Sequence, residues 1–226
     1  MFKMNVILDL DNTLINALSS GDRRKLPNSY SEQFNYVDYI PFFRIYERPH
    51  LQDFLDFLFA NFNVAVITAA ERDYAMFIVD RFILSSTKIK NGKQEIVYYP
   101  NRKLDFIFFS YQVDIGMEIY KGIKNLNMLW DTMDSTGIFR VDNYYPSNTI
   151  IVDDLDEVSQ TNPYNSIRLK NFSVVNDETG EIQYDAINDD ELLKIKEYLI
   201  NVREKFNKTT DKWSDIPLLK ETSVSE

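Results

Sequence analysis

The sequence predicts an α/β fold, in which a mainly parallel, Rossmann-like sheet is flanked by helices. Two short apolar runs, MNVILDL at 4–10 and TIIVDDL at 149–155, have the composition of strands that are buried on both faces, and both carry acidic residues near their ends. Strand-like and helix-like segments alternate between them, an order that is typical of parallel sheets whose strands are connected by helices.

Polar residues separate the first strand from the elements that follow. Residues 16–47 are expected to form a small hairpin-type insertion, with FFRIY at 42–46 as one of its strands. A helix is expected to begin at Pro49, because proline is tolerated at the first helical position and apolar residues then recur at helical spacing. VAVIT at 64–68 has the pattern of a second buried strand, and RDYAMFIVDRF at 72–82 has that of the next helix.

The middle of the chain, residues 86–145, is expected to be a second insertion. Its Asn91-Gly92 pair is a strong signal for the turn of a hairpin. LDFIFFS at 104–110 suits a strand, and a helix is expected through MEIYKGIKNLNML at 117–129.

The C-terminal part completes one predicted domain over residues 1–206. SIRLK at 166–170 suits a further short strand, and DDELLKIKEYLINVREKF at 189–206 suits a helix, whose acidic start and basic end match the helix dipole. The chain has 226 residues, of which 44% are hydrophobic, and this is enough for one sizeable core. Residues 207–226 are expected to be a loosely ordered polar tail.

The composition argues against several kinds of function. The chain has no cysteine, which rules out disulfides, cysteine-based zinc sites and a thiol nucleophile. Its single histidine, His50, argues against a histidine-rich metal site and a Ser-His-Asp triad. A formal net charge of −10 disfavours direct nucleic-acid binding. No run is long and apolar enough to span a bilayer and no signal peptide is recognisable, so no membrane partner and a cytoplasmic or nuclear location are expected.

Polar side chains gather at the carboxyl ends of the predicted strands, where parallel sheets bind their ligands. The side chains expected there are Asp9, Asp11, Thr68, Asp153 and Asp154. Neighbouring carboxylates repel one another unless a cation neutralises them, and Mg²⁺ prefers such oxygen ligands. A carboxylate can also attack phosphorus, while a second carboxyl protonates the leaving oxygen and later activates water. An ordinary strand end followed by a turn is the alternative, which the repeated acidic pattern disfavours.

The stretch DLDNTLI at 9–15 resembles the first motif of the haloacid dehalogenase (HAD) superfamily of phosphotransferases. The resemblance extends over ERPHLQDFLDFL, VITAAERDYAMFIVDRF, KNLNMLW, TIIVDDL, NPYNSIRLKNF and DDELLKIKEYLINV. Their order is similar to that of the branch that contains NLI-interacting factor and the phosphatases of the RNA polymerase II C-terminal domain (CTD). The similarity lies mainly in residues 4–15, 47–82 and 121–203.

The resemblance implies a role for each site residue. Asp9 is expected to be the nucleophile, and Asp11 the general acid and base, with its backbone carbonyl also on the metal. Thr68 is expected to hold the phosphoryl group and Lys124 to neutralise it, with Lys121 remaining open as an alternative. The metal ligands implied are Asp9, Asp11, Asp153 and Asp154, and the further phosphate- or substrate-binding residues are Asn12, Thr13, Ala69 and Arg102.

The sequence departs from the pattern of this branch at two places, and these departures bear on the expected substrate more than on the expected reaction. The chain has Thr68-Ala69-Ala70 where the branch often has Thr-Ala-Ser. The stretch 86–120 has no clear counterpart of the family's substrate-side arginine, for which Arg102 is the candidate.

The implied function is that of a Mg²⁺-dependent phosphatase acting on phosphoserine or phosphothreonine in a polypeptide, through an aspartyl-phosphate. Because no large cap separates Asp11 from Thr68, the site is expected to be open enough for a polypeptide. A phosphatase of small metabolites or nucleotides stays open as an alternative, with 86–145 as a partial lid. A catalytically weak peptide-binding scaffold is a third possibility, which the full set of acids disfavours.

Overall fold

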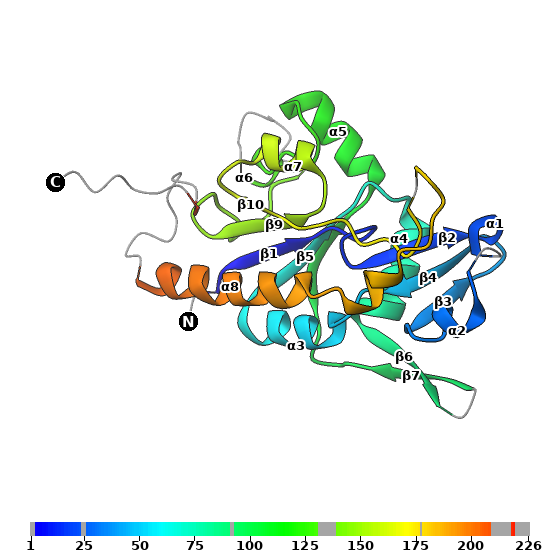
Figure 1. The fold of residues 1–226 in the computed structure, drawn as a ribbon. Coiled ribbons are helices and arrows are strands. Elements are labelled where there is room, and N and C mark those ends of the chain that lie inside the picture. Colours follow the sequence, from blue (N-terminus) through cyan, green and yellow to red (C-terminus); the bar gives the residue numbers. More distant parts are fainter. Residues whose placement is uncertain are drawn as a thin grey trace.

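A parallel sheet forms the centre of the computed structural model (Figure 1). Its strand order is β10-β9-β1-β5-β8, and every pairing in it is parallel, which confirms the predicted fold class. The strands are β1 (Asn5–Leu8), β5 (Asn63–Ile67), β8 (Leu104–Phe108), β9 (Thr149–Asp153) and β10 (Ser166–Arg168). The structure describes residues 3–23, 26–90, 93–130, 139–176, 178–208 and 218–219.

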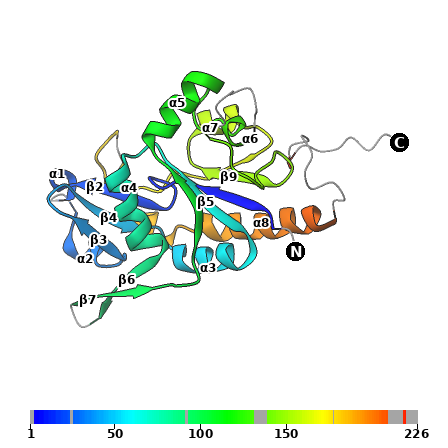
Figure 2. The same cartoon turned by 180° about the vertical axis from the view of Figure 1, so that it is seen from behind.

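Alternate side chains of β1 enter two different hydrophobic cores, one on each face of the sheet. Val6 and Leu8 lie in the core that includes residues of α3 (Leu51–Asn61) and α8 (Glu191–Lys208). Ile7 lies in the core on the other face, which is covered by α5 (Ser110–Tyr120), α6 (Asn127–Trp130) and α7 (Asp156–Thr161). Figure 2 shows the two helical layers from behind. Burial on both faces explains why β1 is apolar throughout.

The first insertion is larger than the predicted hairpin. It is a three-stranded antiparallel sheet, ordered β2-β4-β3, with two short helices. Its elements are β2 (Ile15–Ser19), α1 (Ser20–Arg23), α2 (Asn28–Ser31), β3 (Tyr36–Tyr39) and β4 (Phe43–Glu47). The insertion packs with the segment after β10 in a separate aromatic core, in which Phe34 contacts Tyr46 and Phe172.

The predicted start of the first long helix was wrong by two residues. The helix α3 begins at Leu51, and His50 before it has a left-handed backbone, with a φ of 66°. The backbone N–H of Arg48 donates to the Leu14 carbonyl (3.1 Å). This hydrogen bond holds Arg48 against the loop that follows β1, and the helix begins only after Pro49 and His50.

The second insertion contributes to the main sheet. The helix predicted over 72–82 is α4 (Arg72–Ile78), which continues as a π-helical turn, Val79–Ile83. The strands β6 (Ser85–Lys90) and β7 (Lys93–Tyr98) form the predicted hairpin, whose turn at Asn91-Gly92 lies outside the described residues. The strand predicted at 104–110 is β8, an edge strand of the main sheet.

The single helix predicted over 117–129 was wrong. The chain leaves the helical conformation between α5 and α6, and Lys121, Gly122 and Lys124 have positive φ values there. The short strand β10 and, after a 3₁₀ turn (Tyr184–Asn188), the long helix α8 agree with the predictions for 166–170 and 189–206.

Only two residues are described beyond Lys208. The N–H groups of Leu218 and Leu219 donate to the carbonyls of Pro146 (2.9 Å) and Tyr164 (3.0 Å), so this part of the tail contacts the domain. Within the described part of the chain, no helix combines the length and apolar character that crossing a membrane requires.

Candidate active site

The carboxyl ends of three neighbouring strands bring the predicted acids together. The strand β1 lies between β5 and β9, so residues that follow these strands meet at one edge of the sheet. The N–H of Asp9 donates to the Val152 carbonyl (3.1 Å), which fixes the end of β1 against β9. Asp9, Thr68 and Asp153 are buried here, with exposed fractions of 5%, 1% and 1%.

Three carboxylates in this edge form a candidate cation site. One oxygen each of Asp9, Asp153 and Asp154 lies within 4.8 Å of the others. The Lys124 ammonium donates to Asp9 Oδ1 (2.5 Å) and Asp153 Oδ2 (2.7 Å). When all three acids are ionised, one ammonium leaves two negative charges uncompensated. A divalent, oxygen-preferring cation such as Mg²⁺ fits this donor set.

Burial and mutual repulsion control the protonation of these groups. Burial raises the pKa of Asp153 to about 6, and Asp9 adds to this effect, while Lys124 acts against it. Burial and then Asp9 also raise the pKa of Asp154. Burial by itself lowers the pKa of Lys124, but the carboxylates of Asp9 and Asp153 outweigh it, so this pKa is raised and the ammonium stays charged.

The Asp11 carboxyl is not one of the three carboxylates that form this cluster. It accepts a hydrogen bond of 2.6 Å from the Tyr74 hydroxyl, on the first turn of α4. The pKa of Asp11 is raised to about 6, mainly by burial; the Tyr74 hydrogen bond opposes this rise, and the nearby Asp9 carboxylate adds to it. A carboxyl with this pKa can give and take a proton near neutral pH, as a general acid and base must.

The remaining predicted residues at this edge mainly hold the loops in place. Thr13 Oγ1 donates to Asp154 Oδ1 (3.0 Å), and Thr68 Oγ1 accepts the Ala70 N–H (3.1 Å). Asn12 has a left-handed backbone, with a φ of 58°, and its side-chain oxygen accepts a bond from Asn16 (3.0 Å). Ala69, next to Thr68, is exposed at the same edge.

The structure does not bring Arg102 or Lys121 into this group. Arg102 precedes β8, so it lies at the opposite, amino end of the strands, where its guanidinium binds Asp56 (2.7 Å) and the Ile83 carbonyl (2.9 Å). The exposed Lys121 donates to the Glu118 carbonyl (2.8 Å). Of the two lysines considered, only Lys124 reaches the carboxylates.

Several supporting residues could not be identified from the sequence. Arg48 is fully buried and binds Asp189 with two hydrogen bonds of 2.8 Å, and it also donates to the Thr13 carbonyl (2.9 Å). Asn171 donates to Asp154 (3.2 Å). Tyr74 and Arg48 belong to the stretches that carry the family resemblance, but nothing in their local pattern indicates which groups they contact.

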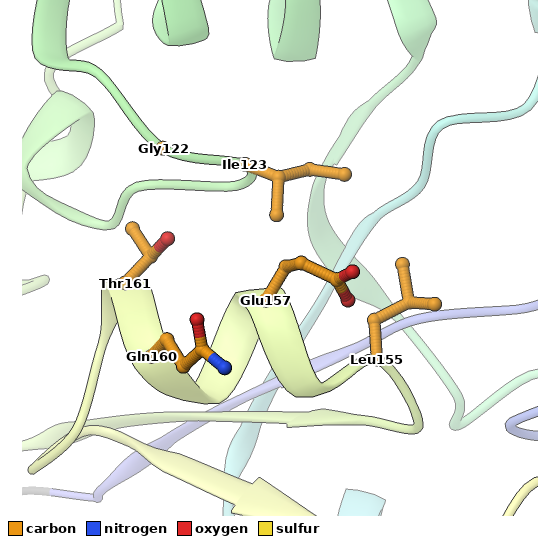
Figure 3. A pocket seen from close by; sticks show the side chains of 6 residues that line it. All are labelled: Gly122, Ile123, Leu155, Glu157, Gln160 and Thr161. Atoms are coloured by element: carbon orange, nitrogen blue, oxygen red, sulfur yellow. The ribbon is translucent and has the colours of Figure 1, made fainter.

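Two pockets flank this edge. One, of about 580 Å³, adjoins Asp11 and is formed by the first insertion and the start of α4. Its lining residues are Asp11, Ala17, Tyr39, Phe42, Phe43, Ala70, Glu71, Asp73 and Tyr74, and we call it the aromatic pocket. The other, of about 510 Å³, lies between the loop that carries Gly122 and Ile123 and the helix α7 (Figure 3).

Comparisons with known proteins identify a phosphatase family. The model of the NLI interacting factor-like phosphatase family matches residues 4–210. Protein 355R of Invertebrate iridescent virus 6, named as CTD phosphatase-like, is 33% identical over 200 residues, which are 86% of this chain and 96% of that protein. Protein 355R of Invertebrate iridescent virus 3 is 35% identical over 201 residues, 87% of this chain and 95% of that protein.

A solved structure shares the fold. Fcp1, described as an essential RNA polymerase II CTD phosphatase, matches with a TM-score of 0.56 at 15% sequence identity, over 91% of this chain and 64% of that chain. The family model and the two viral relatives confirm the resemblance to this branch of the HAD superfamily. The chain belongs to the NLI interacting factor-like phosphatase family.

Proposed function

We propose that the protein is a Mg²⁺-dependent phosphatase that hydrolyses phosphoserine or phosphothreonine in polypeptides through an aspartyl-phosphate on Asp9. The observation that carries this proposal is the convergence of Asp9, Asp153, Asp154 and Lys124 at one buried edge, with Asp11 beside them. Family membership supports the reaction class.

The chemistry follows from the positions of the acids. Asp9 attacks phosphorus, and the bond between phosphorus and the seryl oxygen breaks as Asp11 gives that oxygen its proton. Asp11 then takes a proton from the water that attacks the aspartyl-phosphate, which releases phosphate and restores Asp9. Lys124 and Thr68 would stabilise the phosphoryl oxygens. Asp9, Asp153 and Asp154, with the Asp11 carbonyl, would hold Mg²⁺, which supplies charge neutralisation when bound.

The aromatic pocket supports a polypeptide substrate. It adjoins Asp11, and rigid aromatic side chains such as Tyr39 and Phe42 suit the contact area of a peptide. None of the described residues of 86–145 lines this pocket, so they give no support to a lid from that insertion, as a small-metabolite enzyme would use. The names of the iridescent virus relatives also point toward a phosphorylated CTD-like peptide.

The test compares kcat/KM for phosphoserine peptides with kcat/KM for nucleotides and sugar phosphates, with Mg²⁺ present. We expect higher values for the peptides. Asp9→Asn should abolish turnover of p-nitrophenyl phosphate, whereas Asp114→Asn, on the exposed side of α5, should leave it unchanged. Turnover by Asp9→Asn at the native rate would refute the nucleophile, and a preference for small phosphates would refute the substrate class.

A further inference from the structure

The loop that presents Lys124 has an unusual backbone. Between α5 and α6, Lys121, Gly122 and Lys124 have φ values of 60°, 77° and 46°. The left-handed region is unfavourable for residues other than glycine, so surrounding contacts must hold Lys121 and Lys124 in it. The position of the Lys124 ammonium therefore depends on how this loop is fixed to the rest of the domain.

One buried side chain ties the loop to α7. Asn162, with an exposed fraction of 6%, follows the last residue of this helix. Its side-chain amide donates to the Lys124 carbonyl (3.1 Å), and its side-chain oxygen accepts the Leu126 N–H (2.9 Å). A third bond, from the amide to the Val158 carbonyl (3.0 Å), fixes the asparagine to its own helix.

A second asparagine acts within the loop itself. Asn125 braces the loop internally, since its amide donates to the carbonyls of Tyr120 (3.0 Å) and Lys121 (2.7 Å). The 510 Å³ pocket lies between α7 and the loop (Figure 3). At the end of the helix the loop comes close, since a Cβ on Gly122 would lie 2.6 Å from Thr161 Oγ1.

We propose that Asn162 is a positioning residue, which places the Lys124 ammonium between Asp9 and Asp153 by holding the backbone that directly follows the Lys124 side chain, from the Lys124 carbonyl to the Leu126 N–H. This inference rests on the role proposed for Lys124. The helix α7 begins two residues after Asp154, so the same short element fixes the acids at one end and the lysine loop at the other. Binding of a phosphoryl group at this site requires the acids and the lysine to be in place at the same time.

The experiment compares Asn162→Ala with a matched control, Asn165→Ala. Asn165 has the same exposed fraction of 6%, and its amide donates to two backbone carbonyls, those of Pro146 and Thr149, both at 2.7 Å. These carbonyls lie before and at the start of β9, at the opposite end of the strands. We expect both variants to lower Tm, but only Asn162→Ala to lower kcat for p-nitrophenyl phosphate, by about tenfold or more, and to weaken the Tm increase caused by inorganic phosphate with Mg²⁺.

A double variant separates positioning from general destabilisation. In a Lys124→Met background, Asn162→Ala should cause no further loss of the residual turnover, because the group that it positions is gone. Equal kcat values for Asn162→Ala and Asn165→Ala, or a further tenfold loss in the Lys124→Met background, would overturn the inference while leaving the proposed function intact. Full turnover by Lys124→Met would overturn both the role of Lys124 and this inference. If Asn162→Ala does not fold, Asn162→Ser serves in its place.

Discussion

Removal of the Tyr74 hydroxyl should impair the proposed general acid while leaving the nucleophile intact. The hydroxyl donates to Asp11 at 2.6 Å, and the Tyr74 ring is held by Tyr39 and Phe43, at centroid distances of 5.8 and 6.0 Å. Tyr74→Phe keeps the ring and frees the carboxyl to rotate. A hydrogen bond to a charged group contributes about 1.5–3 kcal/mol, and about 1.4 kcal/mol corresponds to a factor of ten. The expected loss is therefore about tenfold to a hundredfold.

The loss should depend on the leaving group. The seryl oxygen of a phosphopeptide needs a proton from Asp11 as it leaves, whereas p-nitrophenolate is stable without one. Since kcat/KM reports the steps up to the first irreversible one, we expect it to fall by the full factor with a phosphoserine peptide and by less than about threefold with p-nitrophenyl phosphate. Tyr39→Phe removes a hydroxyl from the same aromatic pocket and serves as the control.

The pH profile gives a second readout of the same variant. Asp11 must be protonated to act as an acid, so kcat/KM for the peptide should fall as the pH rises through the pKa of Asp11, which is about 6 in the metal-free protein. The Tyr74 hydrogen bond lowers this pKa, so Tyr74→Phe should move the falling limb to higher pH. Equal losses of kcat/KM with the two substrates would refute the reasoning, and so would a shift of the falling part of the pH profile to lower pH in Tyr74→Phe.

Three further predictions concern the cation site, the arginine and the aromatic pocket. The pKa values of Asp11 and Asp153 are raised from 3.8 to about 6, so their protonation stabilises the metal-free protein below about pH 4, and this contribution is lost as the pH rises through 6. Because Mg²⁺ binds the ionised carboxylates, the Tm increase on adding Mg²⁺ should be larger at pH 7.5 than at pH 5. Equal increases at the two pH values would contradict the cation site. Arg102→Met should lower the free energy of unfolding by about 1–3 kcal/mol in a denaturant titration, because the Ile83 carbonyl loses its donor, but should leave kcat/KM unchanged. Phe42→Ala, at a side chain that is 58% exposed, should raise KM for phosphopeptides without changing Tm or the turnover of p-nitrophenyl phosphate, and an unchanged peptide KM would argue against this pocket as the peptide site.

The direction of a strand decides which polar residues can reach the site, and the sequence shows this only in part. Asp9 and Asp153 each end an apolar run, so their meeting at one edge follows from parallel pairing. Arg102 precedes β8 and therefore lies at the other edge. Because LDFIFFS falls within the insertion that the sequence predicts over 86–145, the sequence does not indicate the direction of this strand relative to the site.

The sequence by itself determined the α/β class and the acids at the carboxyl ends of β1 and β9, because both follow from local apolar patterns and from the rule that parallel strands end together. Only the tertiary structure showed that Lys124, and not Lys121, contacts the carboxylates. Local periodicity predicts one helix through both lysines, whereas the actual backbone turns left-handed between them and is held there by Asn162, which is 38 residues from Lys124 along the chain. A contact over that distance overrides helix propensity, and no local pattern encodes it.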